Sequence, residues 1–193
     1  LQSYVAFPAD KGQVGLRHRF SPPSAPPIGL FPSLPVLLAD LRLTGSSASS
    51  PVSLSLQRAV YDVPTPIVLA GTGLQLDGSG STLNWTGTSS GFPSIIALDQ
   101  NVSQLSVQNL ELLCNQLAGG VIAAFSFNDI AFTDVHVHNV AKRLQAFGFH
   151  ATTAGVVQSG GWVKRSNITS FGFGITAYSR NNGSTGGHHL EDI

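Results

Sequence analysis

The sequence predicts an all-β protein built from short strands that stack as repeating coils. Three observations lead to this prediction: apolar and polar residues alternate, an Asn or Asp interrupts the alternation, and the interruption recurs along the second half of the chain. The interrupting residues are Asn109, Asp134, Asn167 and Asp192, at intervals of 25, 33 and 25 residues. Recurrence at roughly 20 to 50 residues is typical of solenoids rather than of single globular cores.

The alternation predicts strands because successive side chains of a strand point to opposite faces. Apolar Leu105 and Val107 precede the first interruption, and Leu110 follows Asn109 directly. The inward phase therefore slips by one residue, as it does at a corner between two short strands. Asn and Asp suit such corners because they tolerate a left-handed backbone. We expect the four interrupting residues to form an inward-facing structural ladder, not a set of catalytic acids.

The coil with the longest interval holds two further expectations. An insertion is predicted between residues 142 and 153, where it would project as a loop. Arg165 aligns with inward Val107, so either the register slips in this coil or a guanidinium is buried with a partner. A slip is favoured because Trp162 offers an alternative inward residue.

The chain divides at about residue 52. Residues 1–52 form a Pro/Ser-rich N-terminal segment that is partly linker: residues 21–27 read SPPSAPP, typical of an extended polyproline-like stretch, and residues 45–50 are expected to be flexible. Between them, residues 34–43 are apolar enough for one strand or a short helix docked on the end of the solenoid. Residues 53–193 form the repeat domain, which is expected to be truncated at its C-terminal end.

A short amphipathic helix is expected at the start of the repeat domain, within residues 55–61. Ser53 provides a start signal, and Leu54, Leu56 and Ala59 provide apolar positions. Such a helix would cap the open hydrophobic end of the first coil, as the terminal units of solenoids do.

The segments LQRAV (residues 56–60) and IVLAGTGLQLDGSGSTL (residues 67–83), with the corner residues, resemble the pectin-lyase-like superfamily. The resemblance covers roughly residues 53–193 and implies a single-stranded right-handed parallel β-helix with a ladder of inward asparagines. It also implies a polysaccharide or glycan partner and, for the enzymes of the family, polysaccharide lyase or glycoside hydrolase activity. Calcium is implied as a cofactor by this resemblance alone. The same fold carries non-enzymatic adhesins, so the fold does not decide the activity.

Composition excludes some functions and favours a location. Charged residues make up 10% of the chain and the net charge is zero, whereas a protein that binds nucleic acid needs a basic stripe. No apolar run approaches the roughly 18 residues of a membrane span, and the oligomeric state is left open. The single Cys114 is expected in the core, with a reactive thiol as the alternative. An extracellular or cell-surface glycoprotein is favoured by four sequons, at Asn84, Asn101, Asn167 and Asn182.

The catalytic residues stay unknown, because neither a carboxylate pair for hydrolysis nor a base with acidic ligands for a lyase reaction is evident. Outward positions of the corner strands nevertheless carry a cluster of polar side chains. Its members are His136, His138, Lys164, His189 and Glu191. Since neighbouring strands lie about 4.8 Å apart, these side chains can form one substrate-binding patch. A solvated outer face with no ligand is the alternative.

Two further features bear on this patch. His136 and His138 share one face of a strand, but no third ligand is fixed by spacing, so no metal site is predicted. Five aromatic residues are candidates for stacking on a sugar ring: Trp85, Trp162, Phe171, Phe173 and Tyr178. Trp85 is expected to be exposed because it follows the sequon Asn84, and it joins the patch. The leading hypothesis is an extracellular β-helix that binds or processes polysaccharide; the alternative is a non-enzymatic adhesin or structural surface solenoid.

Overall fold

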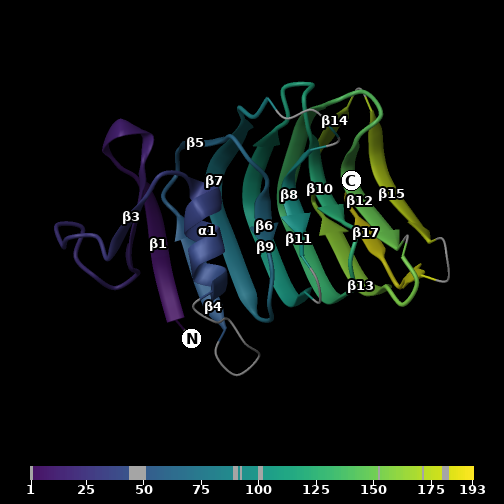
Figure 1. The fold of residues 1–193 in the computed structure, drawn as a ribbon, viewed down its shortest axis with the longest axis horizontal. Coiled ribbons are helices and arrows are strands. Elements are labelled where there is room, and N and C mark those ends of the chain that lie inside the picture. Colours follow the sequence, from purple (N-terminus) through teal and green to yellow (C-terminus); the bar gives the residue numbers. More distant parts are fainter. Residues whose placement is uncertain are drawn as a thin grey trace.

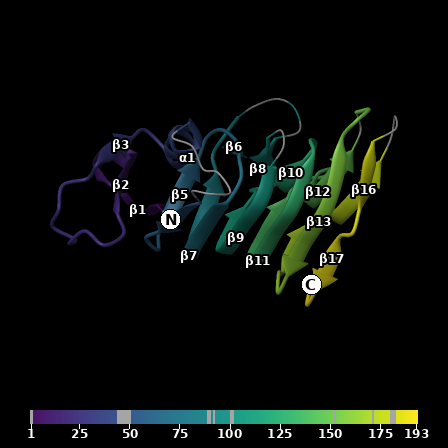
Figure 2. The same ribbon diagram turned by 90° about the horizontal axis from the view of Figure 1, so that it is seen from below.

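The structure, a computed structural model, describes residues 2–43, 51–88, 91, 93–99, 102–151, 153–170, 172–179 and 183–193. These residues form a parallel β-solenoid of about 4 turns, which confirms the predicted fold class. Figure 1 shows the strands side by side along the long axis, from the N-terminal strand to the yellow C-terminal coil. The view from below in Figure 2 shows the same stack of strands from β7 to β17.

Twelve strands form the longer sheet. They are β1 (Gln2–Pro8), β2 (Val14–His18), β3 (Gly29–Phe31), β4 (Val52–Leu56), β5 (Val60–Val63), β7 (Leu74–Trp85), β9 (Val102–Leu113), β11 (Phe127–Val140), β13 (Val157–Lys164), β14 (Ile168–Ser170), β16 (Ser184–Gly186) and β17 (His189–Glu191). Their order is β16-β13-β11-β9-β7-β4-β1-β2-β3, with β14, β17 and β5 paired to β11, β13 and β7.

The shorter sheet closes the other side of each coil. Its strands are β6 (Ile67–Leu69), β8 (Ser94–Leu98), β10 (Gly119–Ala123), β12 (Gln145–Ala151) and β15 (Phe173–Ser179), in the order β15-β12-β10-β8-β6. Strand β12 occupies most of residues 142–153, where a projecting insertion was expected, and that position is wrong because Phe147 and Phe149 are fully buried between the sheets. The extra residues of this coil lie between β12 and β13, since Phe147 follows its partner Val121 by 26 residues whereas Gln158 follows its partner Phe127 by 31.

Register aligns like residues from coil to coil, as the alternation predicts. Leu76, Val107, Phe132 and Val163 lie in one row across β7, β9, β11 and β13. Each is at most 1% exposed. The register slip predicted near Arg165 is confirmed, but Val163 rather than Trp162 is the inward residue.

The corners are residues with a left-handed backbone. Asn109, Asp134 and Asp192 have φ values of 55°, 54° and 53°, and Ser79 opens the same series with 51°. In the remaining coil the corner is Arg165, with φ 46°, because Lys164 pairs with Thr133 and so places Arg165 level with Asp134. The predicted corner at Asn167 is therefore wrong by two residues.

The predicted inward orientation of the corner side chains is also wrong. Asn109 and Asp134 are half-buried, whereas Asn167 and Asp192 are exposed. Two consecutive outward residues, such as Gln108 and Asn109, bridge buried Val107 and buried Leu110, so the bend turns both side chains away from the core.

The capping helix forms, but from a different segment. Residues 52–56 and 60–63 are strands β4 and β5, because Leu54 and Leu56 alternate with serines at period two. The helix is α1 (Leu34–Leu43), which packs against β6, the end strand of the shorter sheet. Its buried positions follow helical spacing: Leu34, Leu37, Leu38 and Leu41. The expectation of a strand or short helix over residues 34–43 is thereby confirmed as a helix.

The N-terminal segment extends the longer sheet. β1 pairs in parallel with β4, whereas β1–β2 and β2–β3 are antiparallel. The Pro-rich residues 21–27 lie in the loop between β2 and β3 and include a turn in which the Ala25 N–H donates to the Pro22 carbonyl at 2.9 Å. The stretch at residues 45–50 lies outside the described residues.

Candidate functional site

Two rows of outward side chains cross the longer sheet along the solenoid axis. Strand alternation exposes them, because from β4 to β13 the residues between the two rows are buried. One row contains Ser53, Gln75, Ser106, Ala131, Trp162 and His189, and the other contains Ser55, Asp77, Gln108, Thr133, Lys164 and Glu191. The rows are hydroxyl- and amide-rich at the N-terminal end and aromatic and charged at the C-terminal end.

At the N-terminal end the rows line an open groove of about 350 Å³, which we call the sheet groove. Its polar lining consists of Arg19, Ser53, Ser55, Gln75, Asp77, Ser106 and Gln108. Asp77 is already engaged, because its Oδ1 accepts hydrogen bonds from Asn109 Nδ2 at 3.0 Å and from the Ser79 N–H at 2.9 Å. The groove therefore offers mainly neutral donors and acceptors.

At the C-terminal end Trp162, Lys164, His189 and Glu191 form one cluster, here called the Trp162 ledge. The Trp162 and His189 rings stack with centroids 3.9 Å apart and an interplanar angle of 13°. Lys164 Nζ lies 4.3 Å from the centre of the Trp162 ring and 3.3 Å from Glu191 Oε2. The structure thus brings together three residues of the predicted patch, Lys164, His189 and Glu191.

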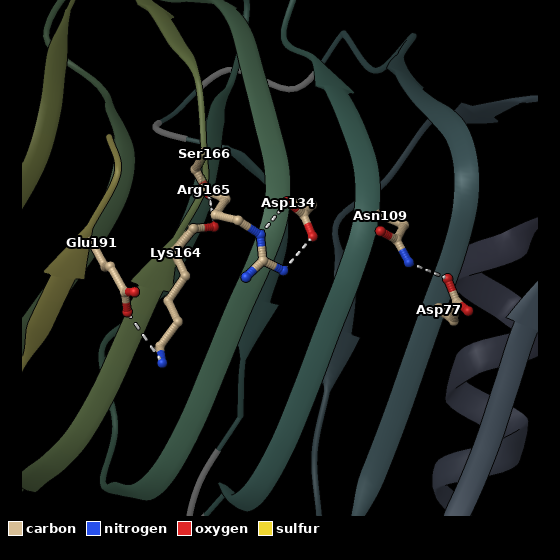
Figure 3. A network of polar contacts seen from close by, with 7 residues as sticks. All are labelled: Asp77, Asn109, Asp134, Lys164, Arg165, Ser166 and Glu191. Carbon is tan, nitrogen blue, oxygen red and sulfur yellow. Dashed lines mark hydrogen bonds and ion pairs between the residues drawn. The ribbon is translucent and has the colours of Figure 1, made fainter.

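Polar contacts between neighbouring coils lie at or beside the corner, and Figure 3 shows three of them: Asn109 with Asp77, Arg165 with Asp134, and Lys164 with Glu191. Arg165 donates from Nε to Asp134 Oδ1 at 2.9 Å and from Nη2 to Asp134 Oδ2 at 2.7 Å. The hydrogen bond from Arg165 lowers the pKa of Asp134, and Asp134 in turn raises the pKa of Arg165. The Asp134 carboxylate is therefore held ionised and paired, which suits a structural contact.

Beyond the corner lies a second open groove of about 420 Å³, the corner groove. It is lined by Arg58, Ser79, Gly80, Asn109, Leu110, Glu111, Asp134 and His136. Glu111 and His136 are register neighbours on β9 and β11. Glu111 Oε2 accepts a hydrogen bond from Thr82 Oγ1 at 3.0 Å.

His136 belongs to the corner groove rather than to the ledge. Its Nδ1 accepts the Asn167 N–H at 3.0 Å, so a neutral ring carries its proton on Nε2. His138 lies two residues further on the same face, level with Leu113 and Thr169, and Val137 between the two histidines is buried as predicted. In the described ranges no group of three or more His, Cys, Asp or Glu side chains could hold a metal ion.

Trp85 does not contribute to this surface. Its side chain is 1% exposed, and Nε1 is buried without a hydrogen-bond partner among the described residues. The prediction of an exposed ring is wrong because β7 continues its alternation through Leu83 to Trp85, both inward. Of the other aromatic candidates, Tyr178 and Phe173 are exposed on the shorter sheet, and Phe171 lies outside the described residues.

Two of the sequons can be placed. Asn84 lies on β7, where its side chain contacts Asp62 and Asn115 at 2.9 and 2.8 Å. Asn167, predicted to point inward, is exposed after the Arg165 corner, so its side chain is accessible for glycosylation. Asn101 and Asn182 lie outside the described residues.

Cys114 lies in the core, 0% exposed, directly after β9. Burial raises the pKa of its thiol to about 12, so the thiol stays protonated at neutral pH. A protonated, buried thiol is a poor nucleophile. The interpretation of Cys114 as a small core residue therefore agrees with the structure.

Comparison with models of known protein families, with curated proteins and with solved structures finds no match to this chain. The protein is a parallel β-solenoid repeat protein. Within the part of the chain that the structure describes, no helix has the length and apolar character needed to cross a membrane.

Proposed function

We propose that this β-solenoid binds polysaccharide along the outer face of its longer sheet, from the sheet groove to the Trp162 ledge. The observation that carries the proposal is the continuity of the two outward rows. Neighbouring strands lie about 4.8 Å apart, so serine hydroxyls and glutamine amides recur at a short, regular spacing. An extended chain of sugars presents hydroxyls in a similarly repetitive way.

The Trp162 ledge supplies an aromatic ring for apolar contact with a sugar, in addition to the hydrogen-bonding groups of the sheet groove. The apolar C–H face of a pyranose packs on an aromatic ring, and polar groups around that ring fix the orientation of the sugar. Trp162 is half-buried and is held by His189 and Lys164, so its ring is ordered before a ligand arrives. Ordering before binding reduces the entropy lost on association.

Binding without cleavage fits the sheet groove and the ledge best. Hydrolysis requires two carboxyl groups that converge on one glycosidic bond. Asp77 Oδ1 accepts hydrogen bonds from Asn109 and Ser79, and Glu191 is paired with Lys164. These pairings support a non-enzymatic adhesin or surface-binding role.

An enzyme of the pectin-lyase-like kind is the second candidate, and the Glu111–His136 pair favours it. These two residues are register neighbours that line the corner groove together. If they act on substrate, the chain should release unsaturated or reducing ends from polygalacturonate in the presence of calcium, and Glu111→Gln and His136→Ala should abolish that release. No release by the unaltered chain would remove this candidate.

The location we propose is extracellular or at the cell surface. The exposed Asn167 in the sequence Asn-Ile-Thr supports it, because glycans are added to accessible sequons in the secretory pathway. An antibody against the protein should label intact source cells or their medium, and glycosidase should reduce the mass of the labelled band. Labelling confined to the cell interior would contradict this location.

The binding proposal is tested on a glycan array followed by calorimetry with the best ligand. Trp162→Ala and Gln108→Ala should each weaken binding by about tenfold or more, corresponding to about 1.4 kcal/mol. Tyr178→Ala is the matched control, because it removes an exposed ring on the other sheet. Unchanged affinity in the Trp162 and Gln108 variants, or no ligand on the array, would overturn the proposal.

A further inference from the structure

His188 places an imidazole inside the coil that contains β16 and β17. His189 pairs with Trp162, so His188 lies level with Gly161 in the inward position. Its ring stacks on Phe149, with centroids 4.8 Å apart and an interplanar angle of 24°, and lies 5.7 Å from the Phe127 ring. Phe149 and Phe127 are both buried.

Gly161 makes room for this ring. A Cβ atom at position 161 would lie 2.6 Å from His188 Nδ1, closer than side-chain atoms tolerate. The missing side chain therefore leaves a slot in β13 that the imidazole fills. The slot and the two phenylalanine rings together hold His188 on the core side of the sheet.

The surroundings of the two ring nitrogens of His188 fit only a neutral imidazole. Nε2 lies 2.5 Å from Thr185 Oγ1, whereas Nδ1 is buried with no partner among the described residues. A neutral imidazole can carry its proton on Nε2 and leave Nδ1 unprotonated. Protonation would add a positive charge and a buried N–H with no acceptor, which is unfavourable in apolar surroundings.

His188 directly precedes His189, which belongs to the Trp162 ledge. β17 is three residues long, it pairs with β13, and it supplies His189 and Glu191 to the ledge. Leu190, the inward residue of β17, is 57% exposed, so the packing of His188 on Phe149 is a core contact directly before this strand. Release of His188 would therefore loosen β17 and remove His189 from the face of Trp162.

We propose that His188 is a pH-sensitive anchor of the Trp162 ledge, so that acid loosens β17 and releases the ligand. The role in ligand release rests on the proposed function, whereas the loosening of β17 does not. The protein would hold its ligand at neutral pH and let it go in an acidic compartment.

The surrounding charges do not offset protonation of His188. His189 disfavours a positive charge on His188. Asp129, whose backbone lies beside Gly160, is exposed on the outer surface. His150 lies on the outward face of β12 beside Gly148, opposite the face on which Phe149 contacts His188. Burial, with a smaller effect of His189, lowers the pKa of His188. Because the folded-state pKa is depressed, the anchor is complete above the ordinary histidine value of about 6.5 and is lost as the pH falls below it.

Hydrogen exchange of residues 183–193 tests the anchor without any ligand. Between about pH 7.5 and pH 5, exchange of β17 amides, corrected for the intrinsic effect of pH, should become about tenfold faster in the unaltered chain. His188→Gln keeps a neutral polar group that can reach Thr185 and should remove the pH dependence. His189→Gln is the control, and its β17 amides should keep the dependence. An equal response in His188→Gln and the unaltered chain would overturn the proposal.

Glycan affinity at the same two pH values tests the release step. The unaltered chain should lose about tenfold in affinity at the lower pH, and His188→Gln should lose little. Absence of glycan binding at neutral pH would count against the proposed function alone, because the exchange measurement still reports on the anchor. A chain whose β17 loosens in acid while its affinity stays constant would refute the release step.

Discussion

Arg165 and Asp134 occupy the same corner of successive coils, and they share two hydrogen bonds of 2.9 and 2.7 Å. Both residues have a left-handed backbone, with φ values of 46° and 54°. Arginine rarely adopts this conformation, whereas asparagine and aspartate do so more readily. In this conformation Arg165 forms the bidentate pair with Asp134 of the preceding coil.

Replacing Arg165 by Asn should change two contributions to stability at this corner. Asn tolerates the left-handed conformation better than Arg does, but it removes the ion pair with Asp134. We expect a lower melting temperature than that of the unaltered chain in about 0.05 M NaCl and a smaller difference in about 1 M NaCl, because salt screens exposed pairs. Thermal unfolding followed by circular dichroism measures both. A difference independent of salt would show that the ion pair contributes nothing.

The corner positions show what the sequence reveals and what it conceals. Asn109, Asp134 and Asp192 could be located because their residue types are enriched at left-handed corners. Arg165 carries no such signal, and the neighbouring Asn167 drew the prediction away from it. Only the register between β11 and β13 decides the position, and register depends on contacts distant in the sequence.

The misplaced helix has a similar cause. Leu54 and Leu56 have a spacing of two, and their neighbours Ala59 and Val60 complete a weak helical pattern over the same residues. Pairing of β4 with both β1 and β7 stabilises the strand, and a single window of sequence does not contain those partners. The outward patch was predicted in part for the same reason: alternation found Lys164, His189 and Glu191, but Trp162 required the correct inward residue, Val163.

Gly78 should not tolerate a side chain, because the next coil approaches it closely. A Cβ atom at position 78 would overlap the Asn109 carbonyl oxygen and the Leu110 side chain. The backbone of the next coil must therefore move to accept an alanine. We expect Gly78→Ala to lower the free energy of unfolding by about 1–3 kcal/mol, as overpacking does.

Urea denaturation of Gly78→Ala and of Gly186→Ala gives the matched comparison. Position 186 has open space beside it, since a Cβ atom there would meet no heavy atom within 4 Å beyond its own chain neighbours. The Gly186 variant should change stability by less than about 0.5 kcal/mol, the usual range for surface substitutions. Equal destabilisation of the two variants would contradict the close approach at Gly78.

Trp85 should behave as a core residue in spite of its sequon neighbour. Trp85→Ala is expected to lower the free energy of unfolding by about 3–5 kcal/mol, because it leaves a large cavity. Trp85→Phe should lower it less, since it also removes the buried Nε1–H that has no partner in the described part of the chain. Urea denaturation measures both variants. A Trp85→Ala variant as stable as the unaltered chain would contradict the burial of the ring.

His150 should make the shorter sheet sensitive to acid independently of the last coil. Its side chain is 8% exposed, its Nε2 lies 2.8 Å from Thr176 Oγ1, and its ring lies 4.2 Å from the Tyr178 ring. Burial lowers the pKa of His150, so the folded chain binds fewer protons here than the unfolded chain does. Its neutral form therefore stabilises the fold above the ordinary value of about 6.5, and that stability is lost as the pH falls through and below it.

The melting temperature of the unaltered chain should thus decrease between about pH 7.5 and pH 5, and His150→Gln should show a smaller decrease. Glutamine keeps a polar group within reach of Thr176 and carries no charge at either pH. His138→Gln is the comparison, because His138 is half-buried on the outer face of the longer sheet. If His150→Gln and His138→Gln change the pH dependence equally, the buried imidazole of His150 is not the group responsible. A variant with both His150 and His188 replaced should lose the two effects additively, because His188 packs on inward Phe149, whereas His150 contacts Thr176 and Tyr178 on the outward face of β12.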